Sequence, residues 1–147
     1  VVGLVKEALA QADYIFLGPG DLYTSILPNL LVNGMSEALA QSKAKLIFTC
    51  CVANRVAGET CGFKASDYVS ELQKYLPRPI DIVILQDAAV KPNTAHFQAK
   101  KWELVAIDAG QWQEKYKIIS HNLYAEQEAG MDWEKLVEPV GKVLDLS

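Results

Sequence analysis

The sequence predicts a three-layer α/β/α domain built on a mostly parallel β-sheet. Short apolar runs with the residue types of buried strands recur at residues 14–17, 45–52 and 80–85. Segments with the i, i+3, i+4 spacing of amphipathic helices lie between them. Strands that alternate with helices at this spacing are typical of parallel βαβ units, which place helices on both faces of a sheet.

One domain accounts for the 147 residues, half of which are hydrophobic and can form a sizeable core. No apolar run approaches the roughly 20 residues of a membrane-spanning helix, and no signal-peptide pattern opens the chain. We therefore expect a cytoplasmic protein without a membrane span. The net charge of −4 argues against a nucleic-acid partner, because neutralising phosphates requires a basic surface.

The three cysteines are expected to be reduced. Cys50 and Cys51 are adjacent inside a strand-like run, where they cannot sensibly pair, and Cys61 makes the number odd. The C-x-x-C spacing and nearby histidine of a zinc site are lacking, so we expect no metal site. Cys50 and Cys51 are better explained as small residues that fill the core.

The first predicted helix covers residues 4–12 and leads into the strand of residues 14–17, which Gly18-Pro19-Gly20 ends abruptly. A glycine-rich turn between a parallel strand and a helix gathers free backbone N–H groups at the carboxyl end of the sheet, which suits a phosphate. Glycines are equally expected in a plain strand-to-helix turn, where they allow positive φ and close packing. The pattern is neither a P-loop nor G-x-G-x-x-G.

The next helix and strand lead to a second polar loop. The helix is expected over residues 29–41, weakened in its middle by Gly34, and residues 45–52 follow as a buried strand. The inward positions of this helix are Leu30, Leu31, Met35, Ala38 and Leu39. Residues 53–64 then form a loop at the carboxyl end of the strand. Because the glycine-rich turn lies at the same edge of the sheet, we expect the two loops to form a cleft.

The remaining elements continue the alternation of helices and strands. Ser66 is predicted to cap a helix that carries Asp67 in its first turn and ends at Pro77. After it we expect a strand at 80–85, a short helix at 93–101, strands at 102–107 and 116–120, the latter at an edge, and a helix at 132–146. Pro139 implies a kink or a late start in the last helix.

No catalytic residue is assigned. His96 and His121 lie far apart with no nucleophile or acid patterned near them, and His121 is expected to be an exposed loop residue. The tryptophans are predicted to pack in the core or at its rim; they are Trp102, Trp112 and Trp133. The missing nucleophile favours binding over catalysis, although phosphoryl transfer needs mainly positioning and charge.

Three segments carry a resemblance to a known family. The run Gly-Pro-Gly-Asp-Leu-Tyr-Thr-Ser at residues 18–25 resembles the CofD-like superfamily, named for 2-phospho-L-lactate transferase, and most of all its branch of gluconeogenesis factors (YvcK-like proteins). Residues 58–69 resemble that branch's Gly-Glu-Thr and Ala-Ser-Asp-His-Val segments, and residues 132–136 resemble its Asp-Pro-x-Lys-Leu. Family members begin with a glycine-rich loop that this chain lacks, so the resemblance implies that residues 1–147 are the C-terminal part of a single CofD-like domain.

The resemblance implies a Rossmann-like sheet that binds a nucleotide or nucleotide sugar at its carboxyl edge. The gluconeogenesis-factor branch is associated with binding UDP-N-acetylglucosamine and regulating central carbon metabolism and cell-envelope precursor flux, without established catalysis. The transferase branch uses a guanosine-linked phospholactate donor and Mg²⁺. The first function is the one we favour, and the second remains an alternative, as does a packing or oligomerisation module without a ligand. Mg²⁺ is the only cofactor that the resemblance suggests.

The candidate ligand-binding residues come from the matched motifs and from the loop just ahead of the second motif. They are Gly18, Gly20, Asp21, Tyr23, Thr24 and Ser25 in the first loop, and Asn54, Arg55, Gly58, Glu59 and Thr60 in the second. Arg55 is the candidate phosphate partner, because it is the only cation in its loop ahead of Gly58. Asp21 stands where the family usually has serine and would repel a phosphate by about 1 kcal/mol, unless Mg²⁺ or an added hydrogen-bond donor intervenes.

A second copy of the chain is the other expected partner. If strands that precede this chain in its relatives are missing, one edge or apolar face of the sheet is left open. The sequence therefore predicts a homo-oligomer.

Overall fold

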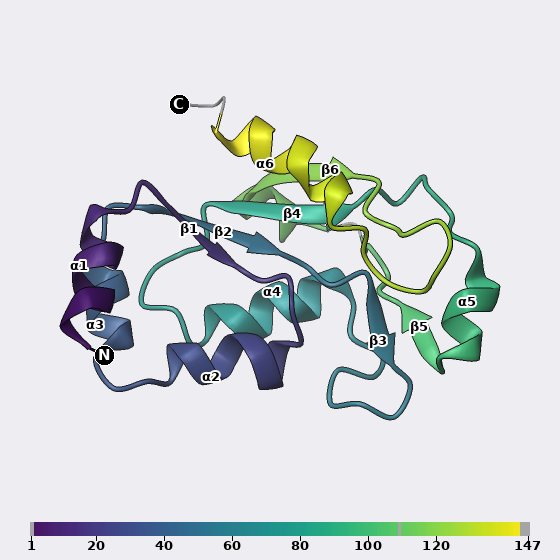
Figure 1. Cartoon of the computed structure of the whole chain (residues 1–147), viewed down its shortest axis with the longest axis horizontal. Coiled ribbons are helices and arrows are strands. Elements are labelled where there is room, and N and C mark those ends of the chain that lie inside the picture. Colours follow the sequence, from purple (N-terminus) through teal and green to yellow (C-terminus); the bar gives the residue numbers. More distant parts are fainter. Residues whose placement is uncertain (1, 109, 145–147) are drawn as a thin grey trace.

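The computed structural model describes residues 2–108 and 110–144, and these form an α/β fold (Figure 1). Four strands make a parallel sheet in the order β1-β2-β4-β6, which confirms the predicted fold class. Its strands are β1 (Tyr14–Leu17), β2 (Lys45–Thr49), β4 (Ile82–Gln86) and β6 (Lys117–His121). The α-helices are α1 (Gly3–Gln11), α2 (Leu27–Leu30), α3 (Met35–Gln41), α4 (Ala65–Gln73), α5 (Thr94–Ala99) and α6 (Val137–Leu144).

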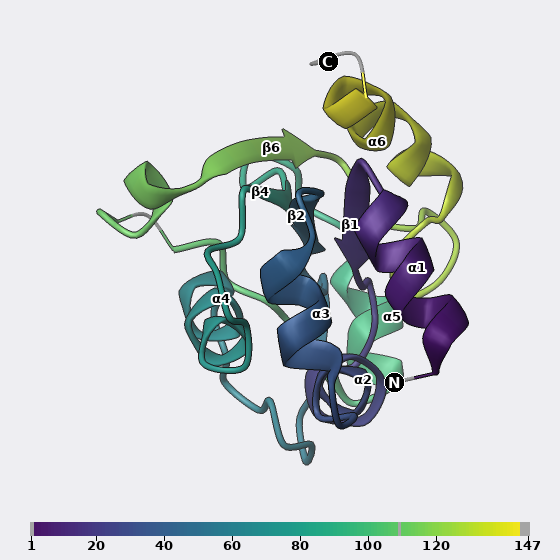
Figure 2. The same cartoon turned by 90° about the vertical axis from the view of Figure 1, so that its left-hand side faces the viewer.

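Helices cover both faces of the sheet, as the alternation along its strands requires. On one face, Phe48 of β2 and Leu85 of β4 pack in a core with α2 and α4. On the other face, Ile47 and Ile84 pack in a second core that includes Val143 of α6. Figure 2 shows α6 on one side of the sheet, with α3 and α4 on the other. All four strands run toward the end of the molecule where α5 lies (Figure 1).

A second, two-stranded sheet lies at the carboxyl ends of the parallel strands. It pairs β3 (Ala53–Arg55) antiparallel with β5 (Trp102–Leu104). The strand predicted over residues 45–52 therefore ends early, because the chain leaves β2 after Thr49 and joins the small sheet. The loop predicted from residue 53 starts as a strand, and the strand predicted over residues 102–107 is shorter and belongs to this sheet.

The helix predicted over residues 29–41 is broken into two. Gly34 has φ of 83°, a left-handed conformation that ends one helical segment before α3 begins at Met35. The side chain of Leu31 was expected to face the core, which is wrong: it is 68% exposed in the turn between the two helices. Ahead of α2, residues 22–26 form one turn of π-helix (η1, Leu22–Ile26).

Three further predictions about the ends of elements need correction. Ser66 does not cap α4: Lys64 is the N-cap, and Asp67 accepts a hydrogen bond from the backbone N–H of Lys64 at 2.9 Å. The last helix does not begin at residue 132, because residues 134–136 form a 3₁₀ turn (η3, Glu134–Leu136). The late start that Pro139 implied is confirmed, and Pro139 lies in the first turn of α6; residues 145 and 146 of the predicted helix lie outside the described residues. His121 ends β6 and is half-buried, not an exposed loop residue. A 3₁₀ turn, η2 (Gln113–Lys115), precedes β6.

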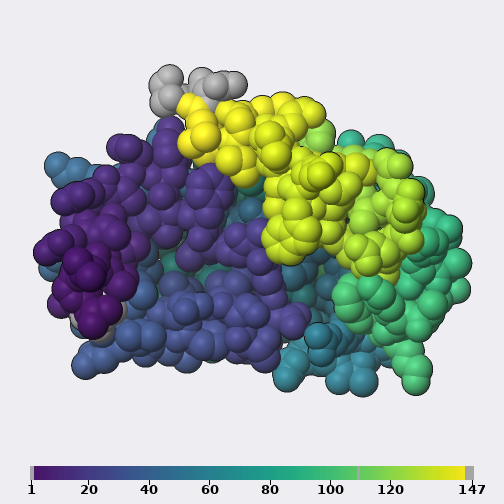
Figure 3. All heavy atoms as spheres, viewed as in Figure 1, coloured from purple at the N-terminus to yellow at the C-terminus, as the bar shows by residue number. Residues whose placement is uncertain are grey.

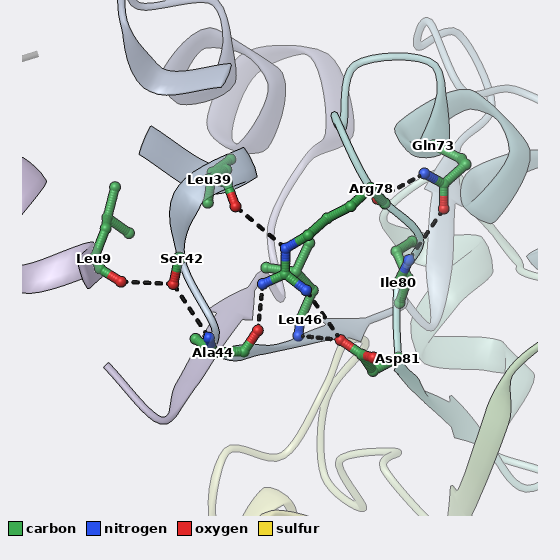
Figure 4. Close-up of polar contacts among 9 residues, drawn as sticks. All are labelled: Leu9, Leu39, Ser42, Ala44, Leu46, Gln73, Arg78, Ile80 and Asp81. Atoms are coloured by element: carbon green, nitrogen blue, oxygen red, sulfur yellow. Dashed lines mark hydrogen bonds and ion pairs between the residues drawn. The ribbon is translucent and has the colours of Figure 1, made fainter. Parts of the chain in front are cut away.

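A hydrogen-bond network around Arg78 fixes the amino ends of the strands (Figure 4). The Arg78 guanidinium donates to the carbonyl oxygens of Leu39 and Ala44, at 3.2 Å for Leu39. It also lies 3.4 Å from the carboxylate of Asp81, which accepts from the backbone N–H of Leu46 at 2.7 Å. One side chain thus joins the end of α3, the start of β2 and the residue before β4.

None of the helices in residues 2–108 and 110–144 is long and apolar enough to cross a membrane.

Candidate functional site

A cleft of about 350 Å³ opens at the carboxyl ends of the parallel strands. Its walls come from three segments, 19–21 after β1, 51–55 after β2 and 128–133 after β6, together with Trp102 of β5. Ligands of parallel α/β sheets bind at this edge, where the loops converge. In Figure 3, yellow-green atoms of the segment after β6 lie beside a recessed area of blue and teal atoms.

The glycine-rich turn after β1 is packed against β2, and a side chain at Gly18 or Gly20 would crowd its neighbours. Gly18 has φ of 81°, and a Cβ on it would lie 3.0 Å from the carbonyl oxygen of Thr49. A Cβ on Gly20 would lie 3.1 Å from the Cβ of Ser25. The thiol of Cys51 donates to the carbonyl oxygen of Gly20 at 3.0 Å, so the turn is joined to the segment after β2. These contacts hold the backbone of the turn at the cleft wall.

The second loop is positioned by a buried polar network around Asn54. The Asn54 carbonyl accepts a hydrogen bond from the Tyr68 hydroxyl at 2.6 Å, and its amide donates to the backbone oxygen of Phe63 at 2.9 Å. Glu103 of β5 accepts from the backbone N–H of Gly62. Burial raises the pKa of the Tyr68 hydroxyl, which therefore stays protonated and donates at neutral pH. The network closes residues 55–63 into a loop at the rim of the cleft.

The charged residues of the two loops face each other. A guanidinium nitrogen of Arg55 lies 3.8 Å from a carboxylate oxygen of Asp21, and both side chains are more than half exposed. An exposed pair of this kind contributes little to stability and is easily rearranged. Arg55 is therefore available to an anion that competes with Asp21.

Cys51 is a poor nucleophile in this setting. Burial raises the pKa of its thiol to about 11, so the thiol is protonated at neutral pH. The thiol of Cys50 is fully buried behind it, and burial raises its pKa well above the ordinary value. The expectation that these cysteines fill the core holds for Cys50, whereas Cys51 also lines the cleft.

The structure brings together part of the predicted ligand set. Gly20, Asp21, Asn54 and Arg55 line the cleft. Gly18 and Ser25 line a neighbouring hollow of about 370 Å³ beside β1. The other predicted residues line neither hollow; they are Tyr23, Thr24, Gly58, Glu59 and Thr60. The predicted convergence of two loops at one edge therefore corresponds to the cleft, with about a third of the predicted residues at its wall.

Tyr23 occupies a packed position. Its ring lies edge-on to Phe63, with the ring centroids 6.5 Å apart, and Phe63 lies edge-on to Tyr68 at 5.6 Å. Burial and the nearby Glu71 raise the pKa of the Tyr23 hydroxyl. In this arrangement the Tyr23 ring packs against Phe63, at the end of the loop of residues 55–63.

Sequence reasoning missed the third wall of the cleft, residues 128–133. The side chain of Trp133, predicted to pack in the core or at its rim, is 66% exposed and lines the cleft. One signal for it was present: the tryptophan stands where the resembled motif Asp-Pro-x-Lys-Leu has proline, so a large aromatic replaces a residue typical of a helix start.

A family model described as 2-phospho-L-lactate transferase CofD matches residues 2–124. The chain belongs to the CofD family. The relatives of this CofD-family chain include a putative gluconeogenesis factor of Thermotoga maritima, 48% identical over 108 residues that are 71% of the chain and 33% of the relative. Another from Thermoanaerobacterium thermosulfurigenes is 44% identical over 126 residues, 82% of the chain and 39% of the relative.

Solved structures confirm the fold of the CofD-family chain. A crystal structure of a UPF0052-family protein from Bacillus halodurans superposes with a TM-score of 0.83 at 31% identity. The match covers 95% of the chain and 46% of the other protein. The CofD-family chain thus spans about a third of the length of the relatives above and just under half of this structural neighbour.

Proposed function

We propose that the chain forms part of a nucleotide-sugar-binding regulatory protein of the gluconeogenesis-factor type, with a ligand of the UDP-N-acetylglucosamine class that affects central carbon metabolism and cell-envelope precursor flux. The observation that carries the proposal is the convergence of two loops: residues 19–21, which belong to the first family motif, and residues 51–55 after β2 line one cleft at the carboxyl edge of the sheet. The gluconeogenesis-factor names of the relatives support it. A cytoplasmic location belongs to the same proposal.

The diphosphate of the ligand is proposed to lie between Arg55 and the glycine-rich turn. Arg55 is the exposed cation of the cleft lining, and its guanidinium suits phosphate oxygens. In the described part of the chain, no three His, Cys, Asp or Glu side chains converge on a metal site. Mg²⁺ is proposed to arrive with the phosphates, with Asp21 as its protein ligand.

The proposed role is binding, without a cysteine nucleophile. The thiol in the lining is protonated at neutral pH because its pKa is raised to about 11. The description of the matching family model favours a second candidate, a transferase acting on a guanosine-linked phospholactate with Mg²⁺. Mg²⁺-dependent turnover of a deazaflavin acceptor by the full-length protein would support this candidate.

Replacing Arg55 with alanine is expected to weaken UDP-N-acetylglucosamine binding by about 10-fold or more, because a charge-assisted hydrogen bond to phosphate contributes roughly 1.5–3 kcal/mol. The melting temperature should change little, since Arg55 is exposed. Calorimetric titration with the UDP-sugar, UDP, GDP and GTP, each with and without Mg²⁺, measures both affinity and selectivity. Lys74→Ala removes an exposed cation at the C-cap of α4 and serves as the control. Equal affinity in the Arg55 variant would remove Arg55 from the site.

Replacing Asp21 with asparagine is expected to raise affinity for the UDP-sugar about fivefold when Mg²⁺ is absent. The change frees Arg55 and removes a carboxylate that repels phosphate by roughly 1 kcal/mol. If Asp21 is also the Mg²⁺ ligand, the variant loses most of the effect of Mg²⁺ on affinity. Unchanged affinity at every Mg²⁺ concentration would place the phosphates elsewhere.

Self-association is the remaining part of the proposal. β1 lies at the edge of the described sheet, and its Phe16 is an exposed large hydrophobic residue, as is Leu4 of α1. Exposed apolar side chains at an unpaired strand edge favour contact with another chain. Sedimentation velocity over a range of protein concentrations tests this, and a monomer throughout would contradict it.

A further inference from the structure

Trp133 is an unusually exposed aromatic residue at the mouth of the cleft. Trp133 is 66% exposed. Burying an aromatic side chain would remove roughly 150–250 Å² of surface from water, so leaving it exposed forgoes a large favourable contribution to folding. It lines both the cleft and an adjoining hollow formed by residues 125–134. Large apolar side chains exposed at the rim of a cavity mark contact sites for ligands.

The backbone that carries Trp133 is held firmly in place. Residues 123–132 form a hairpin: the N–H of Ala125 donates to the carbonyl oxygen of Gly130 at 3.1 Å, and that of Asp132 donates to Leu123 at 2.9 Å. On the other side of Trp133, the N–H of Glu134 donates to the Asp132 carboxylate at 3.0 Å. The tryptophan is therefore exposed on an ordered turn, and little backbone freedom has to be lost when it contacts a ligand.

Hydrogen bonds from a lysine add to this support. The ammonium of Lys135 donates to the carbonyl oxygen of Tyr124 at 2.8 Å and lies 3.2 Å from the carboxylate of Glu126. It joins the start of the hairpin to the 3₁₀ turn that follows Trp133. The position of the Trp133 backbone relative to the cleft is thus set by contacts on both sides of it.

The lining of the cleft is divided by chemical character. The segment after β6 contributes Ala129, Met131 and Trp133, which are apolar, and Trp102 of β5 lies beside Gly130. The loops after β1 and β2 contribute Asp21, Asn54 and Arg55. The segment after β6 also contributes one carboxylate, that of Glu128, which lies 3.7 Å from the ammonium of Lys100. A ligand that carries a flat, weakly polar ring at one end and an anionic group at the other matches this division.

We propose that Trp133 is the stacking platform for the nucleobase of the ligand, a role that rests on the proposed function of the cleft. The base lies against the indole and the thioether of Met131, while the phosphates extend toward Arg55. Stacking on an aromatic side chain is tolerant of base identity, so Trp133 contributes affinity, and base selectivity has to come from polar groups.

The test compares Trp133→Ala and Trp133→Phe in the full-length protein. The alanine variant is expected to bind UDP-N-acetylglucosamine and UDP about 10-fold or more weakly, and the phenylalanine variant within about threefold of the parent, because a ring remains for stacking. Affinity for pyrophosphate, which has no base, should be unchanged in both. Val137→Ala is the matched control, since Val137 is 72% exposed on α6 and does not line the cleft.

The outcomes separate this inference from the proposed function. The stacking role is overturned, and the proposed function stands, if the parent binds the UDP-sugar and Trp133→Ala binds it equally well. The same conclusion follows if Trp133→Ala loses as much affinity for pyrophosphate as it loses for the UDP-sugar. If the parent binds no UDP compound, the proposed function fails. In that case, quenching of indole fluorescence by AMP and GMP tests the stacking role alone. Saturable quenching that is greater in the parent than in Trp133→Phe supports the role, and equal quenching in the two proteins overturns it.

Discussion

Replacing Arg78 with alanine is expected to lower the free energy of unfolding by about 2–4 kcal/mol, because charged hydrogen bonds contribute roughly 1.5–3 kcal/mol each. The substitution removes the donor of the buried carbonyl groups of Leu39 and Ala44 and leaves Asp81 without its guanidinium partner. Because the side chain of Arg78 is 23% exposed, water can replace part of what is lost. Thermal and urea denaturation should show a melting temperature lower by roughly 5–12 °C.

Lysine at the same position separates charge from geometry. Arg78→Lys keeps the positive charge but cannot donate to Leu39, Ala44 and Asp81 from one planar group, so we expect it to recover less than half of the loss. Affinity for the UDP-sugar should be nearly unchanged in both variants at temperatures where they are folded, since the network lies at the amino ends of the strands. A stability equal to that of the parent in Arg78→Ala would show that the network is replaceable by water.

Replacing Asn54 with alanine is expected to reduce stability by about 2–3 kcal/mol and to weaken ligand binding as well. It removes the hydrogen bonds that Asn54 makes to the buried hydroxyl of Tyr68 and to the carbonyl oxygen of Phe63, and losing the partner of a buried polar group costs roughly 1–3 kcal/mol. Binding falls because Asn54 lines the cleft and precedes Arg55. Chemical denaturation and calorimetry with the UDP-sugar measure the two effects.

Tyr68→Phe distinguishes support of the loop from direct contact with the ligand. Tyr68 is buried in α4 and does not line the cleft, yet its hydroxyl donates to Asn54. If the network positions the loop, Tyr68→Phe weakens binding in the same direction as Asn54→Ala, and the double variant loses less than the sum. Strictly additive losses would show that the two residues act independently.

The parallel sheet could be predicted from the sequence because its signals are local. The apolar runs that become β1, β2 and β4 are short, rich in branched and aromatic residues and ended by turn residues. β2 and β4 are buried as expected, whereas β1, also predicted to be a buried strand, lies at the edge of the described sheet and is only partly buried, with Phe16 exposed. The edge position of β6 followed from its weaker apolar character. The α/β/α layering then followed from the alternation of strands with helices.

The missed features depend on contacts between residues far apart in sequence. β3 exists only because residues 102–104 pair with it, and no local pattern in residues 53–55 indicates a strand. Leu31 follows the period of a continuous helix, but the left-handed Gly34 ends that period, so the leucine is exposed. At the site, the glycines and charged residues of the first two walls can be recognised from the sequence of their loops. The third wall cannot, because it exists only when the hairpin after β6 folds back against those two loops.

The Arg78 network and the cleft lie at opposite ends of the same four strands. Mutations that alter the cleft wall at Asp21, Arg55 or Trp133 touch exposed side chains and leave the network at the amino ends intact. Substitutions at these three positions, whether they arise in evolution or in a mutant library, are therefore expected to change ligand preference with little loss in the free energy of unfolding. Asn54 is the exception, because it belongs to both the cleft and the core, and it is the position at which such substitutions would be most constrained.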